Sequence, residues 1–240
     1  VEVAKFSLCL KLLENTTAEE LDAFVHSTSD HILPQLDNNV KNGNSLVDAT
    51  YAKFDPNIYD QVESLESIQM FEWCDEFDDE GFDAIIGNPP YKKIAKNTPE
   101  ATHMKEICYG APNLYFLFWA MGIYNLKDGG EIVYIVPRSW TSGAYFESFR
   151  KYMLLETVIT DIHIFERREK LFDKENVLQE TMIIKVVKKR KRPEKIKITS
   201  SNTSDFSDIK YFRVDYDTIV PQNGYVYLVT NHDEAKTLAT

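Results

Sequence analysis

The sequence predicts an open, mostly parallel α/β sheet with an antiparallel strand near one edge. Three segments carry this prediction: an apolar strand at 82–87, a helix at 114–125 that is apolar nearly all round, and an apolar strand at 132–137. A strand, a helix and a second strand in this order favour a right-handed crossover between parallel strands. We therefore expect a βαβ unit near the middle of the chain.

Local signals define the ends of these central elements. Two prolines follow the strand at 82–87 at once, and proline cannot continue a hydrogen-bonded ladder. Asn113 is expected to cap the helix at 114–125. The Asp-Gly-Gly segment at 128–130 is expected to end that helix through a left-handed turn.

Towards the C-terminus we expect a helix at 145–155 and strands at 157–165 and 180–187 that pair as a hairpin with a long connection. Eight of the thirteen residues from 185 to 197 are Lys or Arg, and a proline interrupts them. This composition predicts a domain boundary near residue 190. Residues 209–229 alternate in short β-like runs, as though another domain were beginning.

The first residues predict a helix, because Val3, Phe6, Leu10 and Leu13 recur on one apolar stripe of residues 1–13. The chain opens with valine, and no polar capping segment precedes this helix. We therefore expect the chain to be a piece of a longer protein.

Two insertions are expected between the first helix and the strand at 82–87. Residues 15–39 form a polar insertion with a short helix, in which Thr17 and Glu20 occupy the positions of a capping box. Residues 48–80 are irregular and acidic. The acidic run at the end of this second insertion is interpreted as a solvated loop.

Composition excludes several classes of protein. The 240 residues include 27 Lys and Arg against 38 Asp and Glu, which gives a net charge of −11, and 43% are hydrophobic. These values are typical of a globular chain and argue against a protein that coats nucleic acid nonspecifically. No apolar run is long enough to cross a membrane, and no signal peptide is recognised.

The sequence gives no indication of a metal site or of a disulfide framework. Cys9, Cys74 and Cys108 are far apart and form no CxxC pair, and the five histidines form no HExxH pair. We assign no metal and expect a reducing, cytoplasmic setting. The sequence does not show the oligomeric state.

The Asn88-Pro89-Pro90-Tyr91 tetrapeptide is the strongest chemical signal. It directly follows a strand, and open α/β sheets bind ligands at the carboxyl ends of their strands. The Asn88 amide oxygen and the Pro89 carbonyl can accept both hydrogens of an exocyclic amine, while the Tyr91 ring stacks on the planar group that carries it. This arrangement aims the lone pair of the amine and makes its nitrogen a nucleophile.

On these residues the sequence resembles the Asn-Pro-Pro-Tyr class of S-adenosylmethionine-dependent DNA adenine-N6 methyltransferases. The resemblance is to members fused to endonucleases in type IIG restriction–modification proteins, and it runs from Val1 to about Lys188. Its landmarks, in the order of the family, are VEVAKFSLCLKLL, NNVKNGNSL, FEWCDEF with GFDAIIGNPPY, NLYFLFWAM, DGGEIVYIVPRSW, and IFERREKLF followed by QETMIIKVV.

The resemblance implies a Rossmann-like class I methyltransferase fold that is incomplete at its N-terminal side. Residues 1–190 would be the C-terminal part of the catalytic domain, and 191–240 the linker and start of the target recognition domain. The family's glycine-rich cofactor loop, the acid that binds the cofactor ribose, and the nuclease would lie upstream of Val1. We therefore expect the isolated chain to be inactive.

The resemblance also implies the ligands and their residues. Asn88, Pro89 and Tyr91 would hold an adenine flipped out of double-stranded DNA. Phe172, which on sequence alone is interpreted as a core residue, would pack on the same base. The residues that would bind the adenine part of S-adenosylmethionine are Leu114 and Phe118, otherwise read as core, and Asn44, which stands where relatives carry an acidic residue.

Two other functions remain open. Glutamine methyltransferases of release factors share the Asn-Pro-Pro-Tyr motif, but they carry a Glu-Pro and glycine-rich segment that residues 92–113 lack. The other alternative is an inactive nucleic-acid-binding module that uses the basic run at 185–197. Whether the chain is a DNA methyltransferase or an inactive nucleic-acid-binding module, Lys189, Arg190 and Lys191 are predicted to contact DNA phosphates. A solvated hinge between domains explains these three residues equally well.

Overall fold

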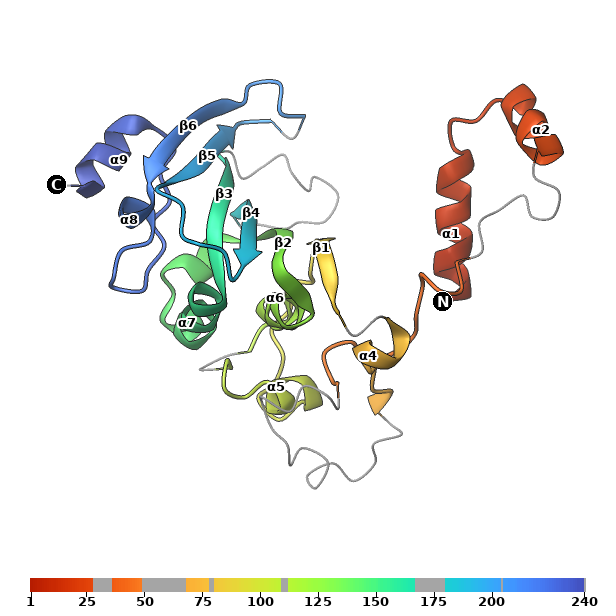
Figure 1. Cartoon of the computed structure of the whole chain (residues 1–240), viewed down its shortest axis with the longest axis horizontal. Coiled ribbons are helices and arrows are strands. Elements are labelled where there is room, and N and C mark those ends of the chain that lie inside the picture. Colours follow the sequence, from red (N-terminus) through yellow and green to blue (C-terminus); the bar gives the residue numbers. More distant parts are fainter. Residues whose placement is uncertain are drawn as a thin grey trace.

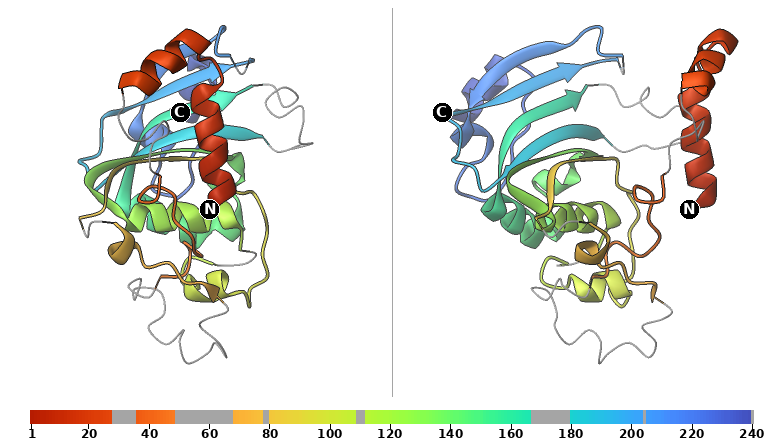
Figure 2. Two further views of the ribbon diagram at one scale, coloured as in Figure 1. Left: turned by 90° about the vertical axis from the view of Figure 1, so that its right-hand side faces the viewer. Right: turned by 45° about the vertical axis from the view of Figure 1, so that its right-hand side comes forward.

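The computed structural model describes residues 1–27, 36–48, 68–77, 80–108, 112–166, 180–203 and 205–239. Most of the predicted insertion at 48–80 lies outside these residues. The described part forms one sheet with helices packed against it, and two N-terminal helices stand apart from that sheet (Figures 1 and 2).

The described residues form a six-stranded sheet with the order β1-β2-β4-β3-β5-β6. Its strands are β1 Phe82–Gly87, β2 Leu126–Pro137, β3 Thr157–Phe165, β4 Thr181–Lys188, β5 Lys195–Ser201 and β6 Lys210–Asp215. β1 is parallel to β2, and β3 is parallel to β5. β4 is antiparallel to both β2 and β3, and β6 is antiparallel to β5. Four of the six strands therefore point the same way.

These directions confirm the predicted α/β class and the pairing of the third and fourth strands as a hairpin. The antiparallel strand of that hairpin, β4, lies inside the sheet between β2 and β3, whereas the antiparallel strand β6 is the outermost strand on one side. Both positions depend on pairing between distant segments, which the local pattern does not encode.

The prediction for the Asp-Gly-Gly segment at 128–130 is wrong. The helix α6 (Leu114–Tyr124) already ends at Asn125, whose side-chain nitrogen donates to the Met121 carbonyl (3.0 Å). β2 then starts at Leu126. The register of β1 against β2 shifts between Phe82, which pairs with Leu126, and Ala84, which pairs with Glu131. Gly129 has φ +83°, so the two glycines form an irregularity within β2.

Helix α6 lies at the centre of the core. Asn113 caps it as predicted, since its side-chain oxygen accepts from the Tyr115 N–H (3.3 Å). The helix packs against β2 and against α7 (Glu147–Glu156). Fully buried aromatic rings join these elements: Phe116, Trp119, Trp140 and Phe149. Truncating one such ring to alanine costs about 3–5 kcal/mol, so this cluster fixes the helix on the sheet.

The two helices expected before residue 39 are present, as α1 (Glu2–Leu13) and α2 (Ala18–Ser27). The Glu20 N–H donates to Thr17 Oγ1 (3.2 Å) and the Thr17 N–H donates to Glu20 Oε2 (2.9 Å), as a capping box requires. The predicted apolar stripe of α1 is exposed, with Val3 at 79% and Phe6 at 62%. No described part of the chain covers it.

Residues beyond 190 continue the same sheet. β5 pairs with β3, and β6 pairs with β5. In the stretch from 209 to 229 only β6 is a strand, and α8 (Tyr216–Ile219) follows it directly. Together with α9 (His232–Ala239), α8 packs against β6. The domain boundary near residue 190 stays a prediction.

No helix in the described ranges is both long and apolar enough to cross a membrane. The remaining short elements are α4 (Trp73–Glu76), α5 (Pro99–His103) and the 3₁₀ turns η2 (Arg138–Thr141) and η3 (Ala144–Phe146).

Candidate active site at the carboxyl edge of the sheet

The carboxyl ends of β1, β2, β3 and β5 meet along one edge of the sheet, because these strands point the same way. We call it the carboxyl edge and the opposite one the amino edge. Asn88 follows β1 at the carboxyl edge, and Arg138 follows β2 there. This is the edge at which open α/β sheets bind ligands.

The Asn-Pro-Pro-Tyr segment brings Asn88 and Tyr91 into contact. The Tyr91 hydroxyl lies 2.8 Å from Asn88 Oδ1 and 3.0 Å from the carbonyl oxygen of Ile135, and its single hydrogen is donated to one of them at a time. Asn88 is exposed, Pro89 is buried and Tyr91 is half-buried. Burial raises the pKa of Tyr91 to about 12, so the hydroxyl remains a donor at neutral pH.

Two glycines, one at the end of β1 and one on α6, pack closely against the Tyr134 side chain of β2. A Cβ at Gly87 would lie 3.1 Å from the Tyr134 ring, and one at Gly122 of α6 would lie 3.0 Å from the Tyr134 hydroxyl. The Tyr134 side chain thus packs closely against both glycines, and a side chain at either position would require it to shift. This packing sets where the chain leaves β1 and enters the motif.

The segment after the motif is fixed to the start of α6. The Leu114 N–H donates to the Lys92 carbonyl (2.9 Å), the Ile94 N–H donates to the Pro112 carbonyl (3.0 Å), and Lys93 forms an antiparallel bridge with Asn113. These backbone contacts place the first turn of α6 beside the motif.

Leu114 and Phe118 form the accessible face of α6. Both are half-buried, whereas the other residues of this helix up to Ile123 are buried. Their spacing of four residues puts them on one face of the helix. An apolar face that is partly open beside the motif suits a flat ring, and its use for the cofactor adenine stays a prediction.

The Asn44 side chain is oriented by two partners. Its nitrogen donates to Glu100 Oε1 (2.7 Å), and its oxygen accepts from the Leu46 N–H (3.3 Å). The oxygen keeps a second lone pair for the amino group of a ligand. Sequence reasoning missed Glu100, which lies 56 residues away on α5, and no local signal could have found it.

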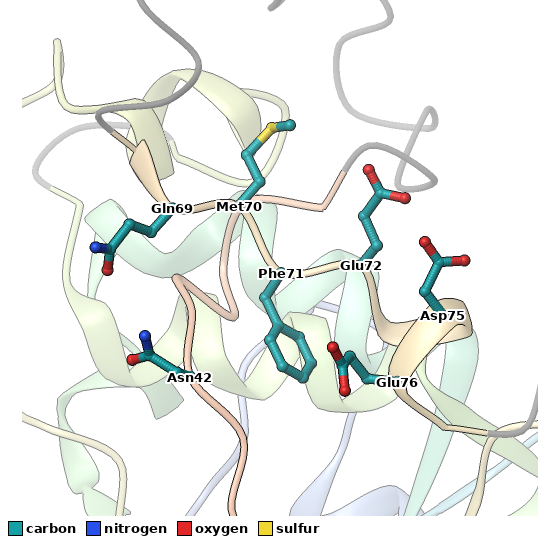
Figure 3. Close-up of a pocket in the computed structure, with 7 residues that line it drawn as sticks. All are labelled: Asn42, Gln69, Met70, Phe71, Glu72, Asp75 and Glu76. Carbon is teal, nitrogen blue, oxygen red and sulfur yellow. The ribbon is translucent and has the colours of Figure 1, made fainter. Parts of the chain in front are cut away.

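A cavity of about 450 Å³ adjoins Asn44, and the sequence analysis did not predict it. The Asn44 N–H donates to the carbonyl of Gln69, which is one of the lining residues (2.6 Å). Figure 3 shows the Phe71 ring between two side-chain amides and three carboxylates. The lining residues are Asn42, Gln69, Met70, Phe71, Glu72, Asp75 and Glu76.

Burial, together with the neighbouring Asp75, raises the pKa of Glu72 in this cavity. Glu76 pairs with Lys41 (2.7 Å). The volume is within the range of small-molecule sites. The described residues contain no group of three or more His, Cys, Asp or Glu side chains arranged to hold a metal ion.

The structure separates Lys189, Arg190 and Lys191 from the motif. They follow β4, whose last residues pair with the first residues of β3, at the amino edge. Lys189 forms an ion pair with Asp128 (3.3 Å). Their contact with phosphates stays a prediction, and Phe172 lies outside the described residues.

Comparison with known families identifies the chain. The model described as Eco57I restriction-modification methylase matches residues 1–172, which is well over half of the sequence. The chain belongs to this family. The resemblance to restriction–modification methyltransferases that the motifs indicated is thereby confirmed.

Relatives of this restriction–modification methylase chain include Type II methyltransferase M.BsuBI of Bacillus subtilis, 38% identical over 160 residues, with 65% of this chain and 32% of the relative covered. Type II restriction enzyme and methyltransferase RM.Eco57I of Escherichia coli is 32% identical over 157 residues, covering 62% of this chain and 14% of the relative. The chain thus spans about a third or less of these relatives. The type IIG restriction endonuclease BpuSI has a TM-score of 0.43 at 20% identity, covering 55% of this chain and 19% of that one.

Proposed function

We propose that this chain is part of a methyltransferase that moves a methyl group from S-adenosylmethionine to N6 of an adenine in double-stranded DNA, within a cytoplasmic restriction–modification system. One observation carries the proposal: Asn88 and Tyr91 lie in contact at the carboxyl end of β1. Membership of the Eco57I methylase family and the names of the relatives support methyl transfer to DNA.

Asn88 and Pro89 act on the amino group of the target base. The Asn88 side-chain oxygen and the Pro89 carbonyl accept the two N6 hydrogens and leave the nitrogen lone pair directed outward. Asn88 Oδ1 has two lone pairs, so it can accept from N6 and from the Tyr91 hydroxyl together. Preorganised acceptors of this kind stabilise the positive charge that develops on nitrogen as it is alkylated.

Tyr91 supplies the surface on which the base stacks. A base taken out of the duplex loses a few kcal/mol of stacking, which an aromatic ring partly restores. The edge-to-face contact with Tyr115 (6.2 Å between ring centroids) holds the Tyr91 ring in place. We propose the same stacking role for Phe172.

S-adenosylmethionine, when bound, supplies an electrophilic methyl group on a sulfonium. The residues proposed to hold its adenine are Asn44, Leu114 and Phe118. The free lone pair on the Asn44 oxygen and the open apolar face of α6 fit an aminopurine. Residues 1–240 contain no Gly-x-Gly segment of the kind that binds the rest of such a cofactor.

We therefore propose that the isolated chain binds S-adenosylmethionine weakly and is inactive, and that residues 191–240 lead into a target recognition domain. Each hydrogen bond missing from the cofactor removes about 0.5–3 kcal/mol, depending on charge, so several missing bonds move a micromolar affinity to millimolar or weaker. Calorimetric titration of residues 1–240 tests this. Micromolar binding at one site per chain would contradict it.

Product analysis tests the proposed reaction. The complete gene product that contains residues 1–240 is incubated with labelled S-adenosylmethionine and either DNA or a glutamine-containing release-factor peptide. We expect label in N6-methyladenine after the DNA is digested to nucleosides. Label in another nucleoside, or in the peptide alone, would overturn the proposal.

A further inference from the structure

Two lysines directly follow the Asn-Pro-Pro-Tyr motif, and a third lies three residues further on. Lys92, Lys93 and Lys96 are exposed, and none of them forms an ion pair with the described part of the chain. Their charges are therefore available to a ligand at the carboxyl edge. This is notable in a chain whose net charge is −11, because the molecule as a whole repels a polyanion.

The basic run at 185–197 has already engaged much of its charge. Lys185 pairs with Glu131 (2.7 Å) and Lys189 with Asp128 (3.3 Å), while Lys188 donates to the carbonyls of Tyr124 and Leu126. Further ion pairs join Arg192 to Asp217, Lys195 to Asp215 and Lys197 to Asp161. The density of basic residues in this run therefore overstates the positive charge that it can offer to an anionic ligand.

Other charge at the carboxyl edge is also engaged. Arg138 donates to the carbonyls of Phe165 and Thr181 and lies 3.6 Å from Glu180. Lys210 pairs with Glu166 (3.4 Å). In the part of the chain that the structure describes, no acidic side chain pairs with Lys92, Lys93 or Lys96, in contrast to these two cations.

The backbone that carries the lysines is held in place. Lys92 and Lys93 lie in the segment that pairs with residues 112–114, and Ile94 between them and Lys96 packs against the core. The Thr98 hydroxyl, which donates to the Ala95 carbonyl (3.1 Å), closes the segment before α5. Because the backbone is held in place here, the positions from which the three lysine side chains extend are fixed relative to the motif.

We propose that Lys92, Lys93 and Lys96 bind backbone phosphates of the DNA strand that carries the methylated adenine. The proposal rests on the proposed function, since it takes DNA as the ligand. The four-residue span from Lys92 to Lys96 covers up to about 14 Å of extended chain, and successive phosphates of one strand are about 3.4 Å apart along the helix axis. A segment of this length, carrying three flexible lysine side chains, can reach more than one phosphate of a strand. Phosphate contacts of this kind fix register without reading sequence.

The test compares two triple variants of the complete gene product that change the charge by the same amount. One is Lys92→Gln, Lys93→Gln and Lys96→Gln, and the other is Lys189→Gln, Arg190→Gln and Lys191→Gln. DNA affinity is measured by fluorescence anisotropy at several KCl concentrations. Each phosphate contact contributes about −0.9 to the slope of log K against log salt concentration. We therefore expect the first variant to make this slope less negative by about 2–3. The second variant tests the earlier prediction for Lys189, Arg190 and Lys191; if the lysines after the motif carry the phosphate contacts instead, it should change the slope by less than about one contact's worth.

A third variant, with Lys92, Lys93 and Lys96 all replaced by arginine, keeps the charge and should keep the wild-type slope. An unchanged slope in the first glutamine variant, or an equal or larger loss in the second, would overturn the proposal. Methylation by the wild-type protein is measured on the same preparation. If the wild type methylates adenine but the slopes do not follow this order, the phosphate proposal fails alone; if it does not methylate DNA, the proposed function fails.

Discussion

Two basic segments of the chain differ in how far their cations are paired: the run at 185–197 and the residues that follow the Asn-Pro-Pro-Tyr motif. At the amino edge, Lys195 lies directly opposite Asp215 in the ladder, and Lys197 lies opposite Asp161. At the carboxyl edge, Lys92 and Lys93 have no acidic side chain across from them in the described structure. Opposite charges on facing strand positions stabilise a sheet and neutralise each other. A dense basic run in the sequence is therefore not by itself evidence of a surface that binds an anion.

The largest expected effect concerns the chemistry at the carboxyl edge. Asn88→Ala in the complete gene product should lower the methyl transfer rate about 10²- to 10³-fold or more, because one preorganised acceptor is lost. DNA affinity should change little, since register on DNA comes from phosphate contacts. Single-turnover kinetics and anisotropy measure the two quantities. Asn39→Ala, at an exposed asparagine outside the motif, is the control and should leave both at wild-type values.

The next effect separates the ring of Tyr91 from its hydroxyl. Tyr91→Ala removes a stacking surface worth about 1–3 kcal/mol, so methyl transfer should fall about 5- to 150-fold. Tyr91→Phe removes only the bond to Asn88 or Ile135, worth about 0.5–1.5 kcal/mol, and should cost about 2- to 10-fold. Equal damage from both substitutions would show that the hydroxyl, not the ring, carries the effect.

Signals confined to neighbouring residues were readable from the sequence. The strand at 157–165, the Asn113 cap and the contact between Thr17 and Glu20 each depend on a few adjacent positions, and the structure has them. The Asn-Pro-Pro-Tyr motif is readable for the same reason. The family resemblance then supplied the class of reaction, which no local pattern contains.

Features that depend on pairing between distant segments were not readable. The sheet places β4 between β2 and β3, a position that the local pattern does not encode. The Glu100 partner of Asn44 and the acidic partners of the basic run likewise follow from register and packing. The contact of the Tyr91 hydroxyl with Asn88 depends on the course of the backbone through the turn, so the sequence alone did not indicate it.

The free energies of unfolding of two lysine variants also test the contrast between the two basic segments. Lys188 at the amino edge donates to two backbone carbonyls at 2.6 and 3.1 Å, so Lys188→Ala should cost about 1.5–3 kcal/mol. Lys92→Ala at the carboxyl edge should change the free energy of unfolding by no more than about 0.5 kcal/mol. Urea unfolding of both variants measures the difference. A larger loss for Lys92→Ala would mean that this lysine is structural.

The last effect is a pH dependence at the carboxyl edge that appears only at alkaline pH. Burial raises the pKa of Tyr91 from its ordinary value of 10 to about 12. The folded protein therefore holds the phenolic proton more tightly than the unfolded chain does. The corresponding stabilisation is complete below pH 10 and is lost as the pH rises from 10 to 12. Tyr91→Phe lacks this proton, so its free energy of unfolding should fall less steeply with pH over the same interval. The two slopes should differ by the equivalent of up to about one bound proton.

Urea midpoints of the wild type and Tyr91→Phe at pH 9, 10 and 11 measure this difference, because all other titrating groups are common to the two proteins. Tyr134→Phe offers a matched comparison, since burial also raises the pKa of Tyr134 to about 12. If Tyr91→Phe follows the wild-type curve while Tyr134→Phe departs from it, the Tyr91 hydroxyl is solvated in solution. The Asn88 oxygen would then be free of its bond to Tyr91 before any base arrives, and Tyr91 would act on the base through its ring alone.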